Sequence, residues 1–436
     1  MEILAGRPGW PSILLGRSAR VAGDAHLAAH EAAGAWAAWR KTIAGTAPEQ
    51  LIGIVERSGL RGRGGAGFPA GRKWRACAET PRGVRYAIAN GFGADPGAHA
   101  DRILMERDPH AVVEGLALAA YAVGATEATI VVGASAQTAA ARLRDAIAAA
   151  EAAGLLGPSV LGTAVALTVT VRTLAGSFVT GEETVLLRAL EDRRAQPDQR
   201  PPYPAVKGLW GKPTLVHNVQ TLAAVPWIVT NGAEAFAPPG VAAAPGTMQL
   251  TLSGALGRPG IVEAPMGTTL RDLLDLAGGA SGTLKALLVG GPTGGFLPAA
   301  ALETPLGFGP LAEAGALVGS GSVLAVGAET SIPELATLLT RFLGDAACGK
   351  SIPCRIGTRR LAELGDALCS GVCRPTDAAL LRTLAADMRD AALCGLEAGA
   401  GNPLVSGMRY FAGEFDASAS GATDPATAAN RPGAHA

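Results

Sequence analysis

Cysteine and serine residues at regular spacing are the first sign of chemistry in this chain. Residues 345–360 read DAACGKSIPCRIGTRR, in which Ser351 lies midway between Cys348 and Cys354. This C-x-x-S-x-x-C pattern is what an iron–sulfur loop of the form C-x-x-C-x-x-C becomes when serine replaces its central ligand. Because thiols in a reducing compartment stay free, a close pair set among glycine, lysine and proline indicates metal binding rather than a disulfide.

A glycine-rich segment, GRGGAGFPAG at residues 62–71, could bind an anion. Glycines let backbone N–H groups converge without obstruction by Cβ atoms, and positive charge is added by Arg61, Arg63, Arg72 and Lys73. The segment is not a dinucleotide fingerprint, because the residues before it have a helical pattern and that fingerprint must follow a strand. A phosphate-bearing ligand is the favoured interpretation, and a solvent-exposed flexible turn is the alternative.

Two adjacent glutamates occur in SFVTGEETVLLRALED, residues 177–192. The pattern predicts a helix that turns three leucines toward a core, with Thr180 and Glu183 as its capping box. Glu182 is then left without a local structural role.

A proline-rich stretch follows at residues 200–222, RPPYPAVKGLWGKPTLVHNVQTL. Its rigid turns lead to Asn218 and Thr221, whose polar groups are suited to hydrogen-bonding the edge of a heterocycle. Taken alone, this signal is weak.

The composition describes a protein without a strong net charge. Lys+Arg and Asp+Glu are equal at 37 each among 436 residues, which argues against binding to nucleic acid or to an anionic membrane. No run of about twenty apolar residues indicates a membrane span, and the first residues, MEILAGRPGWP, lack the pattern of a secretory signal. We therefore expect a cytoplasmic protein of about two to three domains, without direct membrane insertion.

Alternating apolar patterns predict an α/β domain over residues 1–234. Helices are predicted at 24–39 and 48–58, and buried strands at 85–90, 128–134 and 165–174. Alanine-rich helical segments lie between these strands, an alternation that is typical of a parallel sheet.

The rest of the chain has the patterns of two smaller domains. After a linker at 235–246, residues 247–328 follow the order strand, turn, strand, helix and predict a small α+β module. Residues 331–415 have helical patterns and carry five of the six cysteines. The small and polar residues at 416–436 predict a disordered tail.

The remaining cysteines and two of the histidines have plain structural explanations. Cys369 and Cys373, like Cys77, are expected to pack as small apolar side chains. His26 and His30 lie four residues apart on a predicted helix and could share a metal, but no third ligand is evident. An exposed helical face is the favoured interpretation of this pair.

Five ordered segments together resemble a known family: the NADH-oxidising FMN and iron–sulfur subunit of respiratory complex I, the 51 kDa-type subunit also found in NAD-linked hydrogenases and formate dehydrogenases. The segments are SGLRGRGGAGFPAGRKW, TGEET, PPYPAVKGLWGKPT followed by HNVQTL, CGKSIPCRIGT, and LCGLEAGAGNPLVSGMRYF. The resemblance runs from about residue 50 to 415. It implies an α/β FMN-binding domain, a β-grasp module of the soluble-ligand-binding type, and a C-terminal helical bundle that carries one 4Fe-4S cluster.

The resemblance also implies roles for individual residues. Phe68 and Tyr203 would sandwich the adenine of NADH, and Glu182 and Glu183 would lie near the cofactor riboses. The FMN would be held by the glycine loop and nearby polar side chains, namely Arg61, Gly62, Gly64, Gly65, Gly67, Lys73, Asn90, Asn218 and Thr221.

Departures from the family pattern concentrate on the nicotinamide side. Between Asn90 and Gly97, Phe92 and Gly93 stand where the family carries acidic residues, and His217 replaces an asparagine. We expect slower oxidation of NADH and poorer discrimination against NADPH than is usual in the family. Introducing Phe92→Asp and Gly93→Glu together is expected to accelerate the reaction.

The resemblance assigns the cluster to Cys348, Cys354 and Cys394, with Ser351 in the place of the fourth cysteine. Serine is a poorer ligand, because its hydroxyl must ionise or bind neutral and its oxygen suits iron less well than thiolate does. In order of preference, the outcomes are an oxygen-ligated 4Fe-4S cluster, a cluster with one open iron, recruitment of Cys369 or Cys373, and an empty loop. Ser351→Cys is expected to raise cluster occupancy.

These observations favour an electron-input subunit of a larger complex. Hydride would pass from NAD(P)H to FMN, and single electrons would continue through the cluster to a partner such as a thioredoxin-like 2Fe-2S subunit. Through that complex the protein would sit peripherally at the inner face of the membrane. The alternatives are a paralogue that keeps the fold as a docking or assembly subunit, and a flavoprotein that exchanges electrons with a carrier protein instead of NADH.

Overall fold

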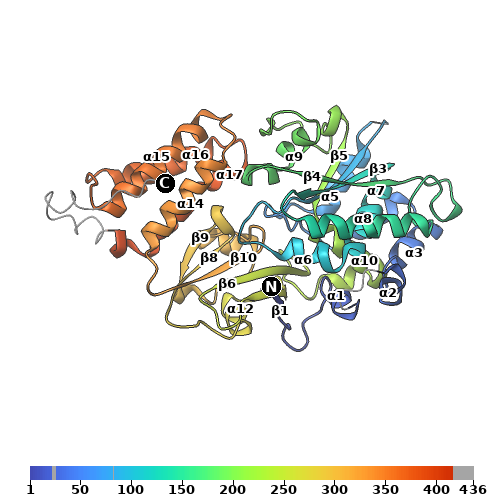
Figure 1. Ribbon diagram of the computed structural model, residues 1–436, viewed down its shortest axis with the longest axis horizontal. Helices are drawn as coiled ribbons and strands as arrows, with labels where there is room; N and C mark the ends of the chain where they lie inside the picture. Colours follow the sequence, from blue (N-terminus) through green and yellow to red (C-terminus); the bar gives the residue numbers. More distant parts are fainter. Residues whose placement is uncertain (22–25, 82, 416–436) are drawn as a thin grey trace.

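The computed structural model describes residues 1–21, 26–81 and 83–415. An α/β domain, a second sheet and a group of C-terminal helices lie next to one another, with the second sheet below the junction of the other two in the view of Figure 1. The tail predicted at 416–436 lies outside the described residues, as does the start of the helix predicted at 24–39.

A four-stranded parallel sheet forms the centre of the first domain. Its order is β4-β3-β2-β5, with β2 (Tyr86–Gly91) between β3 (Glu127–Gly133) and β5 (Thr214–Asn218), and β4 (Thr168–Leu174) at one edge. The three predicted strands and their parallel arrangement are therefore confirmed. The carboxyl ends of β2 and β5 lie side by side, because Asn90 pairs with Asn218.

One face of this sheet buries an apolar core that is rich in alanine, and the other face packs against α9 in a smaller apolar cluster. Helices α7 and α10 pack against each other, and α8 packs against α7 and β4. The helices of the domain are α1 (Gly16–Val21), α2 (Leu27–Ala32), α3 (Ala37–Gly45), α4 (Pro48–Arg57), α5 (Ala70–Glu79), α6 (Ala100–Arg107), α7 (Pro109–Val123), α8 (Gln137–Ala152), α9 (Glu183–Leu190), α10 (Val219–Asn231) and α11 (Ala233–Phe236).

The single helix predicted at 24–39 is wrong. The described part of that segment forms α2 and α3, which are separated at Gly34 and Trp36, with φ of 96° and 64°. The buried carboxylate of Glu114 accepts hydrogen bonds from the backbone N–H groups of Trp36 at 2.8 Å and Trp39 at 3.1 Å. This tertiary contact fixes the start of α3 and overrides the local helical pattern.

His30 is fully buried, so the prediction of an exposed histidine face is wrong for this residue. Its ring lies against the ring of His110, with centroids 4.5 Å apart, and its Nδ1 lies 3.5 Å from the carboxylate of Asp108. In the part of the chain that the structure describes, no three His, Cys, Asp or Glu side chains are placed to hold a single metal ion. His30 is therefore part of the packing between α2 and α7.

The second sheet has six strands in the order β1-β7-β6-β10-β8-β9. Because β1 pairs with β7, the first residues of the chain belong to this sheet and not to the domain predicted at 1–234. The carboxylate of Glu263 holds the segment that follows β1, since it accepts hydrogen bonds from the N–H groups of Ile13, Leu14 and Leu15. The strands are β1 (Glu2–Ile3), β6 (Thr247–Gly254), β7 (Gly260–Pro265), β8 (Leu284–Val289), β9 (Gly295–Pro298) and β10 (Ser322–Gly327).

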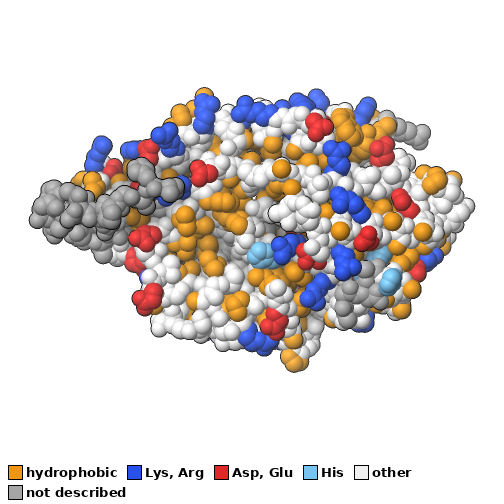
Figure 2. All heavy atoms as spheres, in the orientation of Figure 1, with side chains coloured by type: hydrophobic (Ala, Val, Ile, Leu, Met, Phe, Trp, Pro, Cys, Tyr) orange, Lys and Arg blue, Asp and Glu red, His pale blue; other side chains and the backbone are white. Residues whose placement is uncertain are grey.

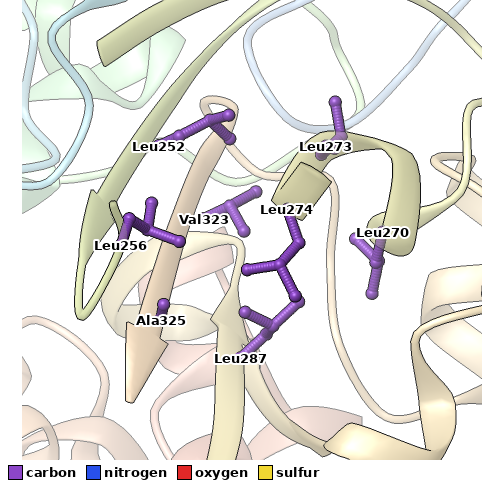
Figure 3. Close-up of a pocket in the computed structure, with 8 residues that line it drawn as sticks. All are labelled: Leu252, Leu256, Leu270, Leu273, Leu274, Leu287, Val323 and Ala325. Carbon is purple, nitrogen blue, oxygen red and sulfur yellow. The ribbon is translucent and has the colours of Figure 1, made fainter. Parts of the chain in front are cut away.

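Helices α12 (Leu270–Leu276) and α13 (Phe308–Glu313) accompany this sheet. Between α12 and the sheet lies a gap of about 10 Å³, and Figure 3 shows the apolar side chains that surround it. It could hold at most about one water molecule and offers that molecule no polar partner, so it is a packing imperfection rather than a ligand site. Its lining residues are Leu252, Leu256, Leu270, Leu273, Leu274, Leu287, Val323 and Ala325.

The described part of the C-terminal region contains the helices α14 (Ile332–Ala346), α15 (Ile352–Ser370), α16 (Asp377–Asp390), α17 (Gly395–Gly399) and α18 (Asn402–Tyr410). Helix α15 packs between α14 and α16, and their shared core includes the side chains of Cys354 and Cys394. Within the described ranges, no helix is both long enough and apolar enough to cross a bilayer.

Candidate functional site

The glycine loop joins α4 to α5 and is fixed by hydrogen bonds to its own backbone and to neighbouring elements. Arg63 is buried, and its guanidinium donates to the carbonyls of Pro245 at 2.5 Å and Thr247 at 3.1 Å. Burial lowers the pKa of Arg63 to about 10. Its N–H donates to the hydroxyl of Thr221 at 2.8 Å, and Arg61 donates to the carbonyl of Gly67 at 2.5 Å. Both arginines and Thr221 therefore hold the loop in shape.

Two glycines show why larger residues would not fit in this loop. A Cβ atom at Gly64 would lie 3.2 Å from Cβ of Asn218, and one at Gly67 would lie 2.6 Å from the ring of Phe308. Gly67 also has φ of 63°, a conformation that favours glycine. The loop consequently runs close to the start of α10 on one side and to the second sheet domain on the other.

Lys73 and Glu183 form an ion pair beside this loop, with Nζ 2.5 Å from Oε2. Nζ of Lys73 also donates to the carbonyl of Val216 at 2.9 Å. Arg200 lies on the other side, with Nη1 3.5 Å from Oε1 of Glu183 and 3.5 Å from Oε1 of Glu182. The two predicted glutamates thus lie between a lysine and an arginine, and the sequence patterns had not singled out Arg200.

The predicted capping box of Thr180 and Glu183 is wrong. Glu182 is the N-cap of α9, and its Oε2 accepts hydrogen bonds from the N–H groups of Thr184 at 2.8 Å and Val185 at 3.0 Å. Thr180 lies in the preceding turn of 3-10 helix. Glu182 therefore has the structural role, while Glu183 is held by ion pairs alone.

Asn218 and Asn90 lie at the carboxyl ends of β5 and β2, and both side chains are engaged. Oδ1 of Asn218 accepts from the N–H of Gln220 at 2.8 Å, and its Nδ2 donates to Asp101 at 2.5 Å. Nδ2 of Asn90 donates to the carbonyl of Gly181 at 2.8 Å. Both amides fix the strand ends around the loop, and each amide group retains hydrogen-bonding capacity for a ligand.

Asp101 is a buried carboxylate that the sequence patterns did not indicate. It accepts hydrogen bonds from the amides of Asn218 and Gln220, at 2.5 and 2.7 Å. Burial is the main cause that raises the pKa of Asp101 to about 6. No local sequence pattern could have identified Asp101, because its partners lie 117 and 119 positions away in the chain.

The segment from Asn90 to Gly97 does not have the geometry that the resemblance implied. Phe92 is 8 % exposed and packs in an apolar cluster with Ile88, Val131 and Leu186. An aspartate at this position would be placed in a hydrophobic core. This burial argues against the expectation that Phe92→Asp would restore an acidic ligand, and Gly93, at φ of 66°, would be strained by a glutamate.

His217, which replaces an asparagine of the family pattern, and Asp95 both have structural partners here. Nε2 of His217 accepts a hydrogen bond from the indole N–H of Trp74 at 3.0 Å, and burial lowers the pKa of His217 well below its usual value. Oδ2 of Asp95 accepts from the hydroxyl of Ser320 at 2.7 Å, which links the α/β domain to the second sheet domain.

Phe68 and Tyr203 are 51 % and 57 % exposed, which is unusual for large aromatic side chains. The guanidinium of Arg72 lies 5.8 Å from the ring centre of Phe68, and that of Arg200 lies 6.0 Å from the ring centre of Tyr203. A separate cleft of about 370 Å³ opens between α9 and residues 198–211, but neither ring lines it; the accessibility of the two rings rests on their exposure. Both rings are therefore accessible for stacking.

Cys348, Cys354 and Cys394 come together at the start of α15 and the start of α17. Cys354 and Cys394 are buried, and Cys394 accepts hydrogen bonds from the N–H groups of Leu396 and Glu397. Burial, with the nearby Glu397 and the other two cysteines, raises the pKa of Cys354 to about 12. A four-iron cluster needs wider ligand spacing than a single ion, because each ligand binds a different iron, so three converging thiols with N–H donors to sulfur fit such a cluster.

Ser351 is the N-cap of α15, and its hydroxyl is 2.5 Å from Oε1 of Glu397. Glu397 is 1 % exposed, and its Oε2 accepts from the N–H of Leu393 at 2.8 Å. This glutamate was not among the predicted ligands. Cys369 lies near the other end of α15, about 22 Å from Cys354 at a rise of 1.5 Å per residue, so it is out of reach of the site.

The glycine-loop side and the cysteine site are adjacent in the structure. Arg200, which contacts both glutamates, also donates to the carbonyl of Leu393 at 3.5 Å, one residue before Cys394. The hydroxyl of Ser177 donates to the carbonyl of Ala346 at 2.8 Å, and Nζ of Lys350 donates to the carbonyl of Pro197 at 2.5 Å. These contacts fix the cysteine loop against the α/β domain.

Three family models match the chain in the order of these domains. The Nuo51 FMN-binding domain matches residues 55–227, the SLBB domain matches 249–297, and the NADH-ubiquinone oxidoreductase-F iron-sulfur binding region matches 334–418. The matches cover the glycine loop, the second sheet and the cysteine site.

Curated relatives match most of the chain. The F 2 subunit of NADH-quinone oxidoreductase from Rhizobium meliloti is 38 % identical over 396 residues, which are 90 % of this chain and 94 % of the relative. The corresponding F-type protein of Escherichia coli is 39 % identical over 87 % of this chain and 86 % of its own. The HndC component of the NADP-reducing hydrogenase of Solidesulfovibrio fructosivorans is 39 % identical over 85 % of this chain and 76 % of its own.

Among solved structures, an NAD⁺-reducing nickel–iron hydrogenase in the H2-reduced state matches with a TM-score of 0.79 and 34 % identity. The match covers 85 % of this chain but only 63 % of that hydrogenase chain. With the relatives and the family models, the likeness extends over the α/β domain, the second sheet and the C-terminal helices. The chain belongs to the family of the F-type subunits of NADH-quinone oxidoreductase and their hydrogenase counterparts.

Proposed function

We propose that this protein is the NADH-oxidising, electron-input subunit of a redox complex of the complex I or NAD-linked hydrogenase type. The observation that carries the proposal is the chain of contacts from the glycine loop to the cysteine site. Lys73 contacts Glu183, Glu183 contacts Arg200, and Arg200 reaches the carbonyl of Leu393 next to Cys394. A nucleotide-binding site and a cluster site are thereby held at a fixed short separation, as electron transfer between them requires.

FMN, when bound, supplies the conversion between two-electron chemistry of a nicotinamide and one-electron chemistry of a cluster. The residues around the FMN site bind the cofactor and orient it. Lys73 and the N–H groups of the glycine loop hold the phosphate. Asn90 and Asn218, fixed by Gly181 and Asp101, direct their remaining hydrogen-bonding capacity to the flavin. Arg61 and Thr221 support the loop from behind.

The nucleotide is placed by a second group of side chains. Phe68 and Tyr203 stack on the adenine, for which their exposed faces are suited. Glu183 accepts hydrogen bonds from ribose hydroxyls, while Glu182 caps α9 with one oxygen and keeps its other oxygen buried beside Arg200. Because Arg200 lies 3.5 Å from each glutamate, it partly offsets their charge and makes a 2′-phosphate less unfavourable.

We also propose a partner and a location. The family architecture would make the second sheet a β-grasp module and the last helices a bundle that presents the cluster to a thioredoxin-like 2Fe-2S subunit or another acceptor protein. On α15, Ile352 and Ile356 are 61 % and 60 % exposed on either side of Cys354. Figure 2 shows Lys and Arg side chains along the edge where α9 and the C-terminal helices lie. Apolar contacts with a basic rim suit an acidic acceptor, and the protein would be peripheral at the membrane within that complex.

A docking or assembly subunit without redox activity is less well supported. It would not need exposed aromatic rings above a glycine loop, or three converging thiols. The variant that exchanges electrons with a carrier protein keeps the flavin and the cluster and differs only in the donor.

Stopped-flow reduction of the reconstituted flavoprotein tests the proposal. We expect FMN to bind near one per chain and to bleach with NADH, and also with NADPH at a rate closer to that of NADH than in the Escherichia coli relative. Flavin that binds but is bleached by neither nucleotide would favour the carrier-protein variant. Absence of FMN binding at saturating FMN would leave only the docking subunit.

A further inference from the structure

The carboxylate of Glu397 lies in the place where the cluster site lacks its fourth thiol. Cys394 and Glu397 are three residues apart, at the start of α17, so their side chains lie on the same face of that turn. Oε1 of Glu397 is 2.5 Å from the hydroxyl of Ser351, which stands midway between Cys348 and Cys354. The glutamate therefore reaches the position of the missing ligand from the opposite side of the site.

The carboxylate of Glu397 is buried and takes part in no ion pair between described residues. Glu397 is 1 % exposed, and its carboxylate accepts hydrogen bonds from one hydroxyl and one backbone N–H. Arg200 and Lys350, which contact the carbonyls of Leu393 and Pro197, pair with Glu182, Glu183 and Asp198 instead. A carboxylate and three cysteine thiolates all bind metal in their anionic forms. Such groups are stable together in a buried site when a cation lies among them.

We propose that Glu397 ligates the fourth iron of the cluster through its carboxylate, and that Ser351 positions it. The proposal rests on the function proposed above only in taking the cysteine site to bind a 4Fe-4S cluster. Carboxylate oxygens are ordinary iron ligands in proteins, whereas a serine hydroxyl would first have to lose its proton. Each carboxylate oxygen accepts one hydrogen bond and has a second lone pair for iron.

Ser351 has a different role in this arrangement. Its hydroxyl donates to Oε1 of Glu397 and accepts, at 3.4 Å, from the N–H of Cys354 as the N-cap of α15. The hydroxyl of Ser351 thus already donates one hydrogen bond and accepts another within the protein. Serine is consequently a positioning residue that orients the carboxylate, in the way outer-shell partners orient ligands at other metal sites.

The test is reconstitution of the full chain with ferrous iron and sulfide under anaerobic conditions, followed by iron analysis and electron paramagnetic resonance. Glu397→Gln keeps the shape and an oxygen for Ser351 but cannot supply an anionic ligand. We expect this variant to lose one iron in four and to show the signal of an oxidised three-iron cluster. Glu363→Gln, an exposed glutamate on α15, is the matched control and should retain the wild-type iron content and spectrum.

Two further variants separate ligand from positioning residue. Ser351→Ala should keep the fourth iron but bind it more weakly, so that it exchanges faster with added iron. Ser351→Cys combined with Glu397→Gln should restore the fourth iron by a thiolate, which also shows that the glutamine variant folds. An unchanged cluster in Glu397→Gln would overturn the proposal.

Two outcomes in the wild-type protein complete the test. If wild-type protein binds no iron whereas the double variant does, the carboxylate fills the space of the cluster, and the proposal is wrong. If the iron results are as expected but FMN does not bind, the proposed function fails and the assignment of Glu397 stands.

Discussion

Lys73 and Glu183 are joined by an ion pair of 2.5 Å, and each side chain is about one-fifth exposed. Lys73 belongs to the first turn of α5, Glu183 to the first turn of α9, and the carbonyl of Val216, which Lys73 also contacts, to β5. An ammonium group has three protons, and two are directed to these acceptors. The third proton remains available to a phosphate oxygen. The ion pair therefore fixes the position from which Lys73 can bind a phosphate.

Lys73→Ala should weaken FMN binding by about 10- to 100-fold. A hydrogen bond to a charged group contributes about 1.5 to 3 kcal/mol, and 1.4 kcal/mol is a factor of ten. The loss also leaves Glu183 without its closest cation, which adds repulsion toward the phosphate. Quenching of FMN fluorescence on titration measures the affinity. Lys41→Ala is the control, because Lys41 lies on α3 and its Nζ likewise donates to a backbone carbonyl, that of Val229. Equal FMN affinity in the two variants would contradict a phosphate contact by Lys73.

Glu182→Ala should lower the free energy of unfolding by about 1 kcal/mol through loss of the N-cap of α9. The two N–H groups that Glu182 satisfies would then have no side-chain acceptor. Glu182→Asp should recover most of this stability, because aspartate is a good N-cap. Urea unfolding without FMN is the measurement. If Glu182→Ala were as stable as the wild type, Glu182 would not be the cap.

Sequence patterns were sufficient for the elements that depend on local composition. The strands around residues 86–91, 127–133 and 168–174 are short apolar runs, and the helix at 48–57 has a clear apolar face. Spacing within one loop also brought Ser351 and Cys354 together, because Ser351 is the N-cap of α15 and accepts a hydrogen bond from the N–H of Cys354; iron ligation by this loop stays a prediction.

The patterns failed where a residue's role depends on a distant partner. The motif predicted Glu183 in the capping box, but Glu182 caps α9. The 3-10 turn that ends at Gly181 places Glu182 at the N-cap position. Arg200 and Asp101 were missed because their contacts are tertiary and their types are common on surfaces. Phe92 was interpreted as a lost acid, although its apolar side chain predicted burial on its own.

Asp101 should make stability depend on pH between about 4 and 6. Its pKa is raised from 3.8 to about 6 in the folded protein, mainly by burial, so the folded state binds a proton that the unfolded state has lost. The stabilisation is present below pH 4 and is lost as the pH rises through 6. Asp101→Asn removes this titration, and the difference in unfolding free energy between wild type and variant should change by roughly 3 kcal/mol across the window, at about 1.4 kcal/mol per pKa unit. Parallel curves of unfolding free energy against pH for the two proteins would exclude a raised pKa of Asp101.

Phe92→Asp should destabilise the protein by at least about 3 kcal/mol, because it removes a buried ring and places a carboxylate without a partner in an apolar cluster. It should not accelerate reduction of FMN by NADH. Phe92→Leu is the matched control and should cost less, because it retains most of the apolar volume. Urea unfolding gives the stability and stopped-flow bleaching gives the rate. A folded aspartate variant with faster bleaching would return Phe92 to the nucleotide site.

Phe68 and Tyr203 should affect binding of the nucleotide but not of the flavin. An aromatic stacking contact contributes about 0.5 to 1.5 kcal/mol beyond its buried area, so Phe68→Ala and Tyr203→Ala should each raise KM for NADH by about 2- to 10-fold. Tyr203→Phe keeps the ring and should leave KM nearly unchanged. Trp210→Ala is the control, because Trp210 is as exposed as Tyr203, at 57 %, but makes an edge-to-face contact with Tyr86 at the start of the central strand β2. Steady-state reduction of an artificial acceptor gives KM and kcat, and fluorescence titration gives FMN affinity. A fall in kcat at constant KM, or a loss of FMN in either alanine variant, would show that these rings serve the flavin and not the adenine.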